Sequence, residues 1–153
     1  MSRKPLIVLA AVTALALPTA AAAETSAFAE AKEGNLRVFS SVLLTRKAVD
    51  MMGGWLNESQ PCTAERRLRV RIEILRTRGG TTSEYTDRVT QKVTNCAEGG
   101  PNLGFQLAAS DTGFACPNGT WRPGRYDLIT RTKHLASGLI AMASLLVVDR
   151  TPC

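Results

Sequence analysis

Few residues in this chain could do nucleophilic or acid–base chemistry. His134 is the single histidine of the 153-residue sequence, so a nucleophile–histidine–acid triad would have to use it. It stands between Lys133 and Leu135 in a predicted turn, and no Gly-x-Ser-x-Gly motif accompanies it. A single histidine also argues against a tetrahedral zinc site when the cysteines are paired. We therefore interpret His134 as an exposed turn residue, and we expect no catalytic or metal-ligating residue and no cofactor.

Carboxylates are the second group that could support hydrolysis, because a glycosidase needs two of them about 5–9 Å apart. The acidic residues considered show no spacing that brings two together; they are Glu65, Glu73, Glu84, Asp87 and Asp111. Aromatic residues, which form carbohydrate-binding platforms, make up only 5% of the sequence. A small secreted hydrolase is therefore an alternative without a supporting motif, and we expect the protein not to be an enzyme.

Arginine is the sharpest surface feature of the sequence. Six arginines fall within 13 residues: Arg66, Arg67, Arg69, Arg71, Arg76 and Arg78. In a strand, alternation places Arg67, Arg69 and Arg71 on one face, where Arg88 and Lys92 of the next strand can join them. These five side chains form a candidate anion-binding face, because guanidinium groups bind phosphate and carboxylate in a bidentate manner. The alternative is a solvated sheet face that discourages edge aggregation.

The N-terminus is typical of an export signal. Arg3 and Lys4 supply a positive start, residues 6–17 form a mostly apolar run too short to cross a bilayer, and Ala21-Ala22-Ala23 supplies small residues for cleavage. Residues 1–23 carry two cations and no acid, so their removal leaves 130 residues and lowers the formal charge from +6 to +4. We expect a bacterial protein that is secreted or periplasmic.

The composition of the remaining chain bounds its partners. No later segment has the roughly 20 apolar residues of a transmembrane helix, so we expect no membrane span in the mature chain. A modestly basic exported protein favours anionic partners, such as an envelope surface or an acidic protein. We do not expect nucleic acid as a partner, because the domain lacks a stacking surface.

Alternation of apolar and polar residues predicts an all-β domain. Residues 66–76 show it most clearly, with Leu68, Val70, Ile72 and Ile74 on one parity and charged residues on the other. Further strands are predicted at 36–45, 84–94, 103–109, 121–132 and 137–149. The last of these is apolar on both parities and is expected to be a central strand covered on both faces. A short helical turn is one interpretation of 46–54.

Residues 36–153 are therefore predicted to form one antiparallel β-sandwich of six or seven strands, preceded by a flexible N-terminal arm at 24–35. The first hairpin turns at Gly79-Gly80. A two-residue loop would place Arg71 opposite Arg88, a like pair that costs roughly 0.2–1 kcal/mol. We therefore favour a longer loop over 79–82, which places Glu73 opposite Arg88.

The four cysteines, Cys62, Cys96, Cys116 and Cys153, are an even number typical of two disulfides in an oxidising compartment. Reduced thiols are the alternative if the chain stays in the cytosol. Cys62 and Cys96 each lie 17 residues from residue 79, and Cys116 and Cys153 flank the predicted turn at 133–136. We favour the pairs Cys62–Cys96 and Cys116–Cys153, each contributing on the order of 3–4 kcal/mol in the chain-entropy model. The parity of the first pair conflicts with the longer loop and requires a bulge.

The segment Trp121-Arg122-Pro123-Gly124-Arg125-Tyr126 resembles a phrase of bacterial secreted immunoglobulin-like β-sandwich proteins. In those proteins a tryptophan, a Pro-Gly turn and a tyrosine introduce a late strand. The resemblance implies an antiparallel two-sheet fold, a tyrosine hydroxyl that ties a corner between strands, and no catalytic activity. The Cys…Trp…Cys spacing of antibody domains is absent, so the resemblance does not extend to their inter-sheet disulfide.

The sequence therefore predicts an exported, non-catalytic binding or envelope-associated module. The first alternative is a secreted inhibitor of a protease or other enzyme that presents a disulfide-braced loop, at 97–102 or 117–119. The small secreted hydrolase described above is the second alternative.

Overall fold

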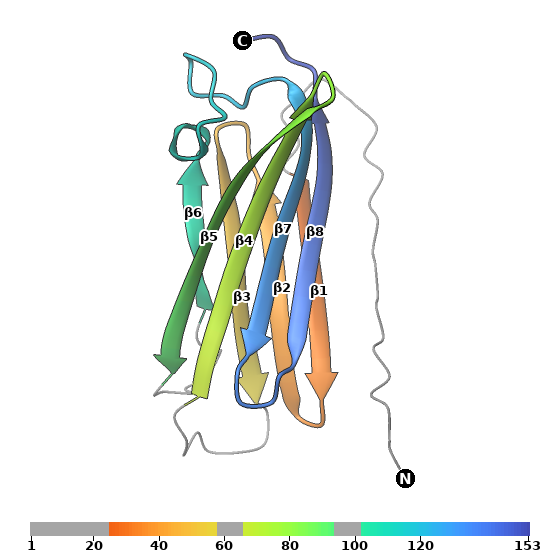
Figure 1. Cartoon of the computed structure of the whole chain (residues 1–153). Coiled ribbons are helices and arrows are strands. Elements are labelled where there is room, and N and C mark those ends of the chain that lie inside the picture. The colour runs from red at the N-terminus through yellow and green to blue at the C-terminus, as the bar shows by residue number, and fades with distance from the viewer. Residues whose placement is uncertain (1–24, 58–65, 94–101) are drawn as a thin grey trace.

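A computed structural model describes residues 25–57, 66–93 and 102–153, and in this part the chain forms two four-stranded antiparallel sheets that face each other (Figure 1). Their strand orders are β1-β2-β3-β6 and β5-β4-β7-β8. The strands are β1 (Thr25–Glu33), β2 (Leu36–Leu44), β3 (Ala48–Asn57), β4 (Arg66–Arg78), β5 (Thr81–Val93), β6 (Asn102–Ala108), β7 (Gly124–His134) and β8 (Ile140–Asp149). A 3-10 helix, η1 (Ala109–Thr112), follows β6.

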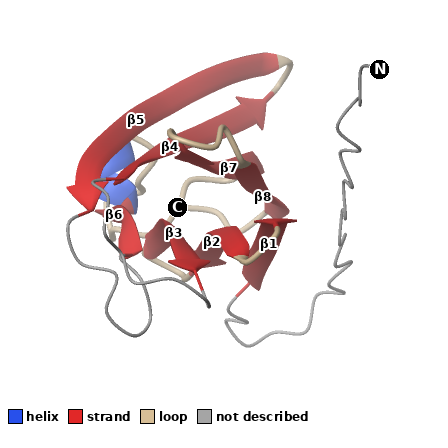
Figure 2. Cartoon of the chain, turned by 90° about the horizontal axis from the view of Figure 1, so that it is seen from below, coloured by secondary structure: helices blue, strands red, loops and turns tan. Residues whose placement is uncertain are grey.

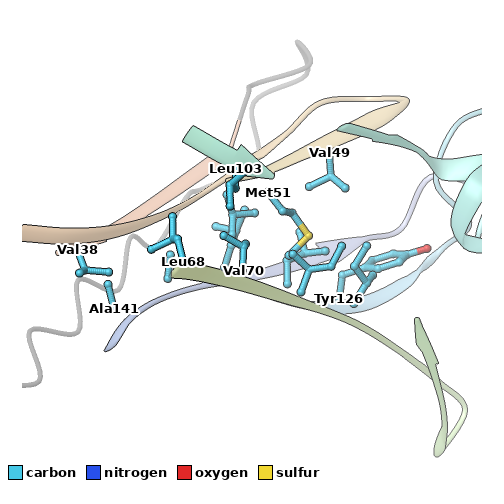
Figure 3. Packing of buried hydrophobic residues seen from close by; sticks show 14 of the residues in the cluster. Val38, Val49, Met51, Leu68, Val70, Leu103, Tyr126 and Ala141 are labelled. Atoms are coloured by element: carbon cyan, nitrogen blue, oxygen red, sulfur yellow. The ribbon is translucent and has the colours of Figure 1, made fainter. Parts of the chain in front are cut away.

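The core lies between the two sheets. Leu68, Val70, Ile72 and Ile74 of β4 are fully buried, as the sequence alternation predicts, and they face buried residues of the opposite sheet. Figure 3 shows residues from both layers, among them Val49 and Met51 of β3, interdigitating in this space. Burying one aliphatic side chain contributes about 1.5–3 kcal/mol, so these strands supply the main drive for folding.

Two interpretations of residues in the first sheet are wrong. The seven strands β2–β8 lie within 36–153, in line with the six or seven predicted there, and the eighth strand of the described residues, β1, precedes that range. The flexible arm predicted at 24–35 is mostly strand β1, whose half-buried residues are Ala27, Ala29 and Ala31. Alanine gives a weak hydrophobic signal, so the alternation was hidden in the sequence. Residues 48–57 form β3 and not a helical turn, because pairing with both β2 and β6 outweighs local preference.

The register of the first hairpin also differs from the prediction. Gly79 and Gly80 alone connect β4 to β5, and Arg71 lies opposite Arg88. Both glycines have positive φ angles, +58° and +80°, as the hairpin turn that matches strand twist requires. The longer loop would place the same residues inward, so burial cannot separate the two registers. Turn geometry therefore outweighs the cost of one like-charge pair.

The two sheets approach closely near one end of the interior. The hydroxyl of Ser40 on β2 lies 2.7 Å from Oγ1 of Thr132 on β7 and 2.9 Å from the carbonyl oxygen of Ala141 on β8. Gly53 of β3 faces the same threonine, and a Cβ added there would lie 1.8 Å from its Oγ1. Only a residue without a side chain fits at this position.

Strand β8 is an edge strand, not the central strand predicted for 137–149. Its inward residues Ala141, Ala143 and Leu145 are buried, while the alternate residues of the strand face outward and are exposed. Strand β1 of the other sheet lies beside it, as Figure 2 shows. The outward apolar residues of β8 therefore have no covering layer in the described part of the chain.

The disulfide predicted between Cys116 and Cys153 is present, with Cα atoms 5.3 Å apart. It joins the C-terminal end of the chain to the segment before β7, and it is compatible with a protein that lies outside the cytosol. The predicted pair Cys62–Cys96 lies outside the described residues.

Replacing Gly53 with alanine should destabilise the fold by about 1–3 kcal/mol, because the new methyl group overlaps Thr132. Thermal or urea unfolding measures the change. Thr132→Ala in the same background should recover part of the loss, since it removes the nearest atom. Equal stability of Gly53→Ala and the unaltered protein would contradict this close approach.

Replacing both Cys116 and Cys153 with serine should lower the free energy of unfolding by about 3–4 kcal/mol, because the disulfide closes a loop with a sequence separation of 37 residues. Urea unfolding of this variant and of the unaltered protein, both without reductant, measures the difference. An unchanged unfolding midpoint would show that the bond does not constrain the unfolded chain.

Candidate anion-binding face

The outward face of the second sheet gathers cations from three strands. Register places Arg67, Arg69 and Arg71 of β4 on this face, as predicted, with Arg88 of β5 opposite Arg71. Lys92, the fifth predicted member, lies opposite Arg67 in the same ladder, and its side chain is outside the described set. The strand order also brings in β7, which the sequence prediction did not include.

Strand β7 supplies two further cations. Arg131 lies opposite Arg71, and Lys133 lies opposite Arg69. The sequence contains a pattern that indicates this placement, because Thr130, Thr132 and His134 alternate with the two cations. The structure buries these three residues, so the cations face outward. Sequence reasoning missed them because nothing local to 124–134 says that β7 pairs with β4.

Three arginines therefore stand in one row across the sheet: Arg88, Arg71 and Arg131. Neighbouring strands are about 4.8 Å apart, so each guanidinium side chain stands next to another of the same charge. Like charges directly opposite each other are destabilising by about 0.2–1 kcal/mol per pair. Arg71, in the middle of the row, is paired with Glu73 at 3.2 Å, which offsets part of this repulsion; the remainder lowers the stability of the sheet.

Charge is segregated along the length of the face. The rows that contain Arg67, Arg69 and Arg71 hold cations and uncharged residues, and we call this part the basic half. Acidic residues begin at the next row, where Glu73 pairs with Arg71 at 3.2 Å, and continue with Asp127. Asp127 lies 3.8 Å from Arg125. The second half of the face, which we call the mixed half, thus carries three carboxylates, on Glu73, Glu84 and Asp127, and one cation, Arg125.

An open hollow of about 460 Å³ lies in the basic half. Arg69, Arg71 and Arg88 line it together with Thr86 and Asp87. Nε of Arg69 donates to Oγ1 of Thr90 at 3.3 Å, and the Asp87 carboxylate accepts the backbone amide of Arg88 at 2.7 Å. Three guanidinium groups around one open hollow can donate to a phosphate, sulfate or carboxylate group.

His134 is buried, contrary to the prediction of an exposed turn residue; it is only 1% exposed. Its ring packs edge-on against Trp55, with centroids 5.5 Å apart. Its Nδ1 accepts the backbone amide of Ser137 at 3.2 Å and lies 2.9 Å from the Ser137 hydroxyl. The inward parity of β7 places the ring inside, where it packs in the core and holds the β7–β8 turn.

The carboxylates considered for hydrolysis serve several separate contacts. Glu73 pairs with Arg71, and Asp111 accepts the backbone amide of Ala108 at 2.7 Å. Burial raises the pKa of the Tyr85 hydroxyl, and the charges of Asp87 and Asp111 raise it further. Glu84 is exposed on β5, and Glu65 lies outside the described residues.

No group of residues able to hold a metal ion occurs in the part of the chain that the structure describes.

The Trp121–Tyr126 segment forms a buried aromatic corner. The Tyr126 hydroxyl donates to the carbonyl of Arg122 at 2.6 Å, and Nε1 of Trp121 donates to the carbonyl of Thr45 at 3.1 Å. Burial raises the pKa of the Tyr126 hydroxyl above its ordinary value of 10.0, and the positive charge of Arg76 opposes the shift. The tyrosine thus makes the kind of corner tie that the sequence resemblance implies.

Of the two loops considered for enzyme inhibition, the structure describes the one at 117–119 in full. Residues 97–101 lie outside the described part. Residues 117–119 form a tight turn, in which the amide of Gly119 donates to the carbonyl of Cys116 at 2.9 Å. The side chain of Asn118 accepts from the backbone amide and the hydroxyl of Thr120. This turn sits next to the disulfide and is exposed at Pro117 and Asn118.

Comparison of the sequence with protein-family models and with curated protein sequences gives no match. In the described residues, none of the helical structure has the length and apolar character needed to cross a membrane.

Removing one charge from the arginine row should stabilise the protein. We expect Arg131→Thr to raise the free energy of unfolding by about 0.2–1 kcal/mol at low salt, with a smaller gain at high salt. The matched control is Arg125→Thr on the same strand and face, which removes an arginine beside Asp127 and should give no such gain. A loss of stability in Arg131→Thr would show that the row is not repulsive.

Proposed function

We propose that this chain is an exported, non-catalytic binding module whose basic half binds anionic groups on an envelope surface or a partner molecule. The observation that supports it most is the row formed by Arg88, Arg71 and Arg131. A face kept only for solubility would be better served by alternating signs, which stabilise cross-strand pairs. A bound anion would turn the repulsion within the row into attraction.

The hollow beside the row supports the same proposal. Arg69, Arg71 and Arg88 line it beside Thr86 and Asp87, and the backbones of all five residues belong to two paired strands. The long side chains also carry positive charge outward, which attracts anions from solution at low ionic strength.

Export is supported by two independent features. Residues 1–23 have the pattern of an export signal, and the Cys116–Cys153 disulfide suits an oxidising compartment. We propose that Cys62 and Cys96 form the second disulfide and that the protein is periplasmic or secreted. In that location the partners available to a basic face include phosphorylated and carboxylated envelope polymers.

Strand order supports an immunoglobulin-like assignment of the fold. Immunoglobulin domains place strands A, B and E in one sheet and C, F and G in the other. Here β2, β3 and β6 would correspond to the first set, β4, β7 and β8 to the second, and β5 to an added strand beside C. The Tyr126 hydrogen bond near the start of β7 matches the tyrosine corner at strand F. Strand β1 is an addition to that pattern.

Titration with long-chain inorganic polyphosphate tests the anion-binding function. The full chain should bind it in low salt, and Arg71→Gln combined with Arg131→Gln should weaken binding by about tenfold or more, because two charge-assisted donors are lost. The control combines Arg46→Gln with Arg125→Gln, which removes the same charge from a turn and from the mixed half of the face. If both double variants lose polyphosphate affinity equally, the loss reflects net charge and not the basic half. If the Arg71/Arg131 double variant still binds polyphosphate tightly, the basic half is not the binding site.

A further inference from the structure

The exposed large apolar side chains of the described residues lie on two neighbouring strands. Phe28 of β1 is 60% exposed, and four residues of β8 are 42–56% exposed: Ile140, Met142, Leu146 and Val148. These four residues, which we call the apolar ridge, share the outward parity of one edge strand. Strands β1 and β8 run side by side where the two sheets meet (Figure 2).

Three of the four ridge residues stand beside a cation of β7. Ile140 lies opposite Lys133, Met142 opposite Arg131, and Val148 opposite Arg125, whereas Leu146 lies opposite Asp127. The Arg131 guanidinium contacts the Met142 sulfur at 3.6 Å. The Ile140–Met142 end of the ridge therefore adjoins the basic half within one strand spacing, and the Leu146–Val148 end continues the same surface beside Asp127 and Arg125.

The charges next to the ridge indicate what can cover it. Lys133 and Arg131 stand beside Ile140 and Met142, so whatever covers this end of the ridge also meets two positive charges. Electrostatic complementarity favours a covering surface that is negatively charged there. A partner must therefore offer apolar contact and negative charge side by side.

An anionic phospholipid bilayer offers both. Aliphatic side chains can enter the boundary between headgroups and acyl chains, while the long arginine and lysine side chains reach the phosphates. The ridge lies on an outward-facing edge strand, and the hollow found in the basic half is lined by arginines that suit a phosphate group. A bilayer also needs no groove on the protein that binds it.

We propose that the second sheet docks on an anionic lipid surface, with the apolar ridge inserted at the headgroup boundary and the basic half on the phosphates. This inference rests on the proposed anion-binding function, and it specifies an anionic lipid bilayer as the partner that the basic half binds. It adds a requirement that anion binding alone does not have, because the aliphatic residues of β8 must contribute to affinity.

Sedimentation with vesicles tests the inference on the full chain. Vesicles of phosphatidylcholine that contain phosphatidylglycerol should bind the protein, and vesicles of pure phosphatidylcholine should bind it far more weakly. Leu146→Gln combined with Val148→Thr should lower the partition coefficient for the anionic vesicles by about tenfold. Ile140→Thr combined with Met142→Gln is a second ridge variant, should the first unfold. Residues 1–24 are common to all variants, so differences between variants report on the ridge.

Ser144→Gln is the matched control, because it changes an outward residue of the same strand that is already polar. It should leave vesicle binding unchanged, and the ridge variants should bind polyphosphate as the unaltered chain does. Loss of vesicle binding with retained polyphosphate binding supports the inference. Vesicle binding that is insensitive to both ridge variants would overturn it and leave anion binding intact.

Two further outcomes separate this inference from the function on which it rests. Polyphosphate binding without any binding to anionic vesicles would overturn lipid docking alone and would favour an acidic protein or polymer as the partner. Failure to bind either probe would overturn both proposals.

Discussion

Burial of alternate residues of β4 and β7 is the constraint on which the rest of the structure depends. Leu68, Val70, Ile72 and Ile74 face the opposite sheet, so every other residue of β4 must face solvent. A shift by one residue would bury arginines and expose the core, which no sheet tolerates. The same rule on β7 sends Arg131 outward. The core therefore decides where the cations of β4 and β7 stand.

The basic half also shows which forces prevail when local preferences disagree. Charge alone would favour a register in which Glu73 faces Arg88, yet the chain turns at two glycines with positive φ angles and brings Arg71 against Arg88. One repulsive surface pair costs less than a hairpin turn that opposes the twist of its strands. The Arg71–Arg88 pair thus follows from turn geometry, whereas Arg131 joins the row through the pairing of β7 with β4.

Sequence patterns predicted the elements whose burial signal is strong and local. The alternation of 66–76 gave β4, and symmetry about the second hairpin gave the Cys116–Cys153 pair. Where the sequence pattern was weak or ambiguous, the prediction was wrong. Alanines made β1 look like an arm, and the apolar run of β8 looked like a central strand, because composition does not reveal whether a second layer covers a face. His134 looked exposed because its strand, predicted to end at residue 132, continues for two more residues.

The sequence by itself determined the all-β class, the hairpins, and the shared face of Arg67, Arg69 and Arg71, because each depends on residues close together in the chain. Only the tertiary structure decided that β7 lies beside β4, that Gly53 meets Thr132, and that β8 forms an exposed edge. Strand neighbours are determined by packing between segments far apart in the sequence. The two-residue alternation of a strand indicates which of its faces is buried, but it does not indicate which segment packs against that face.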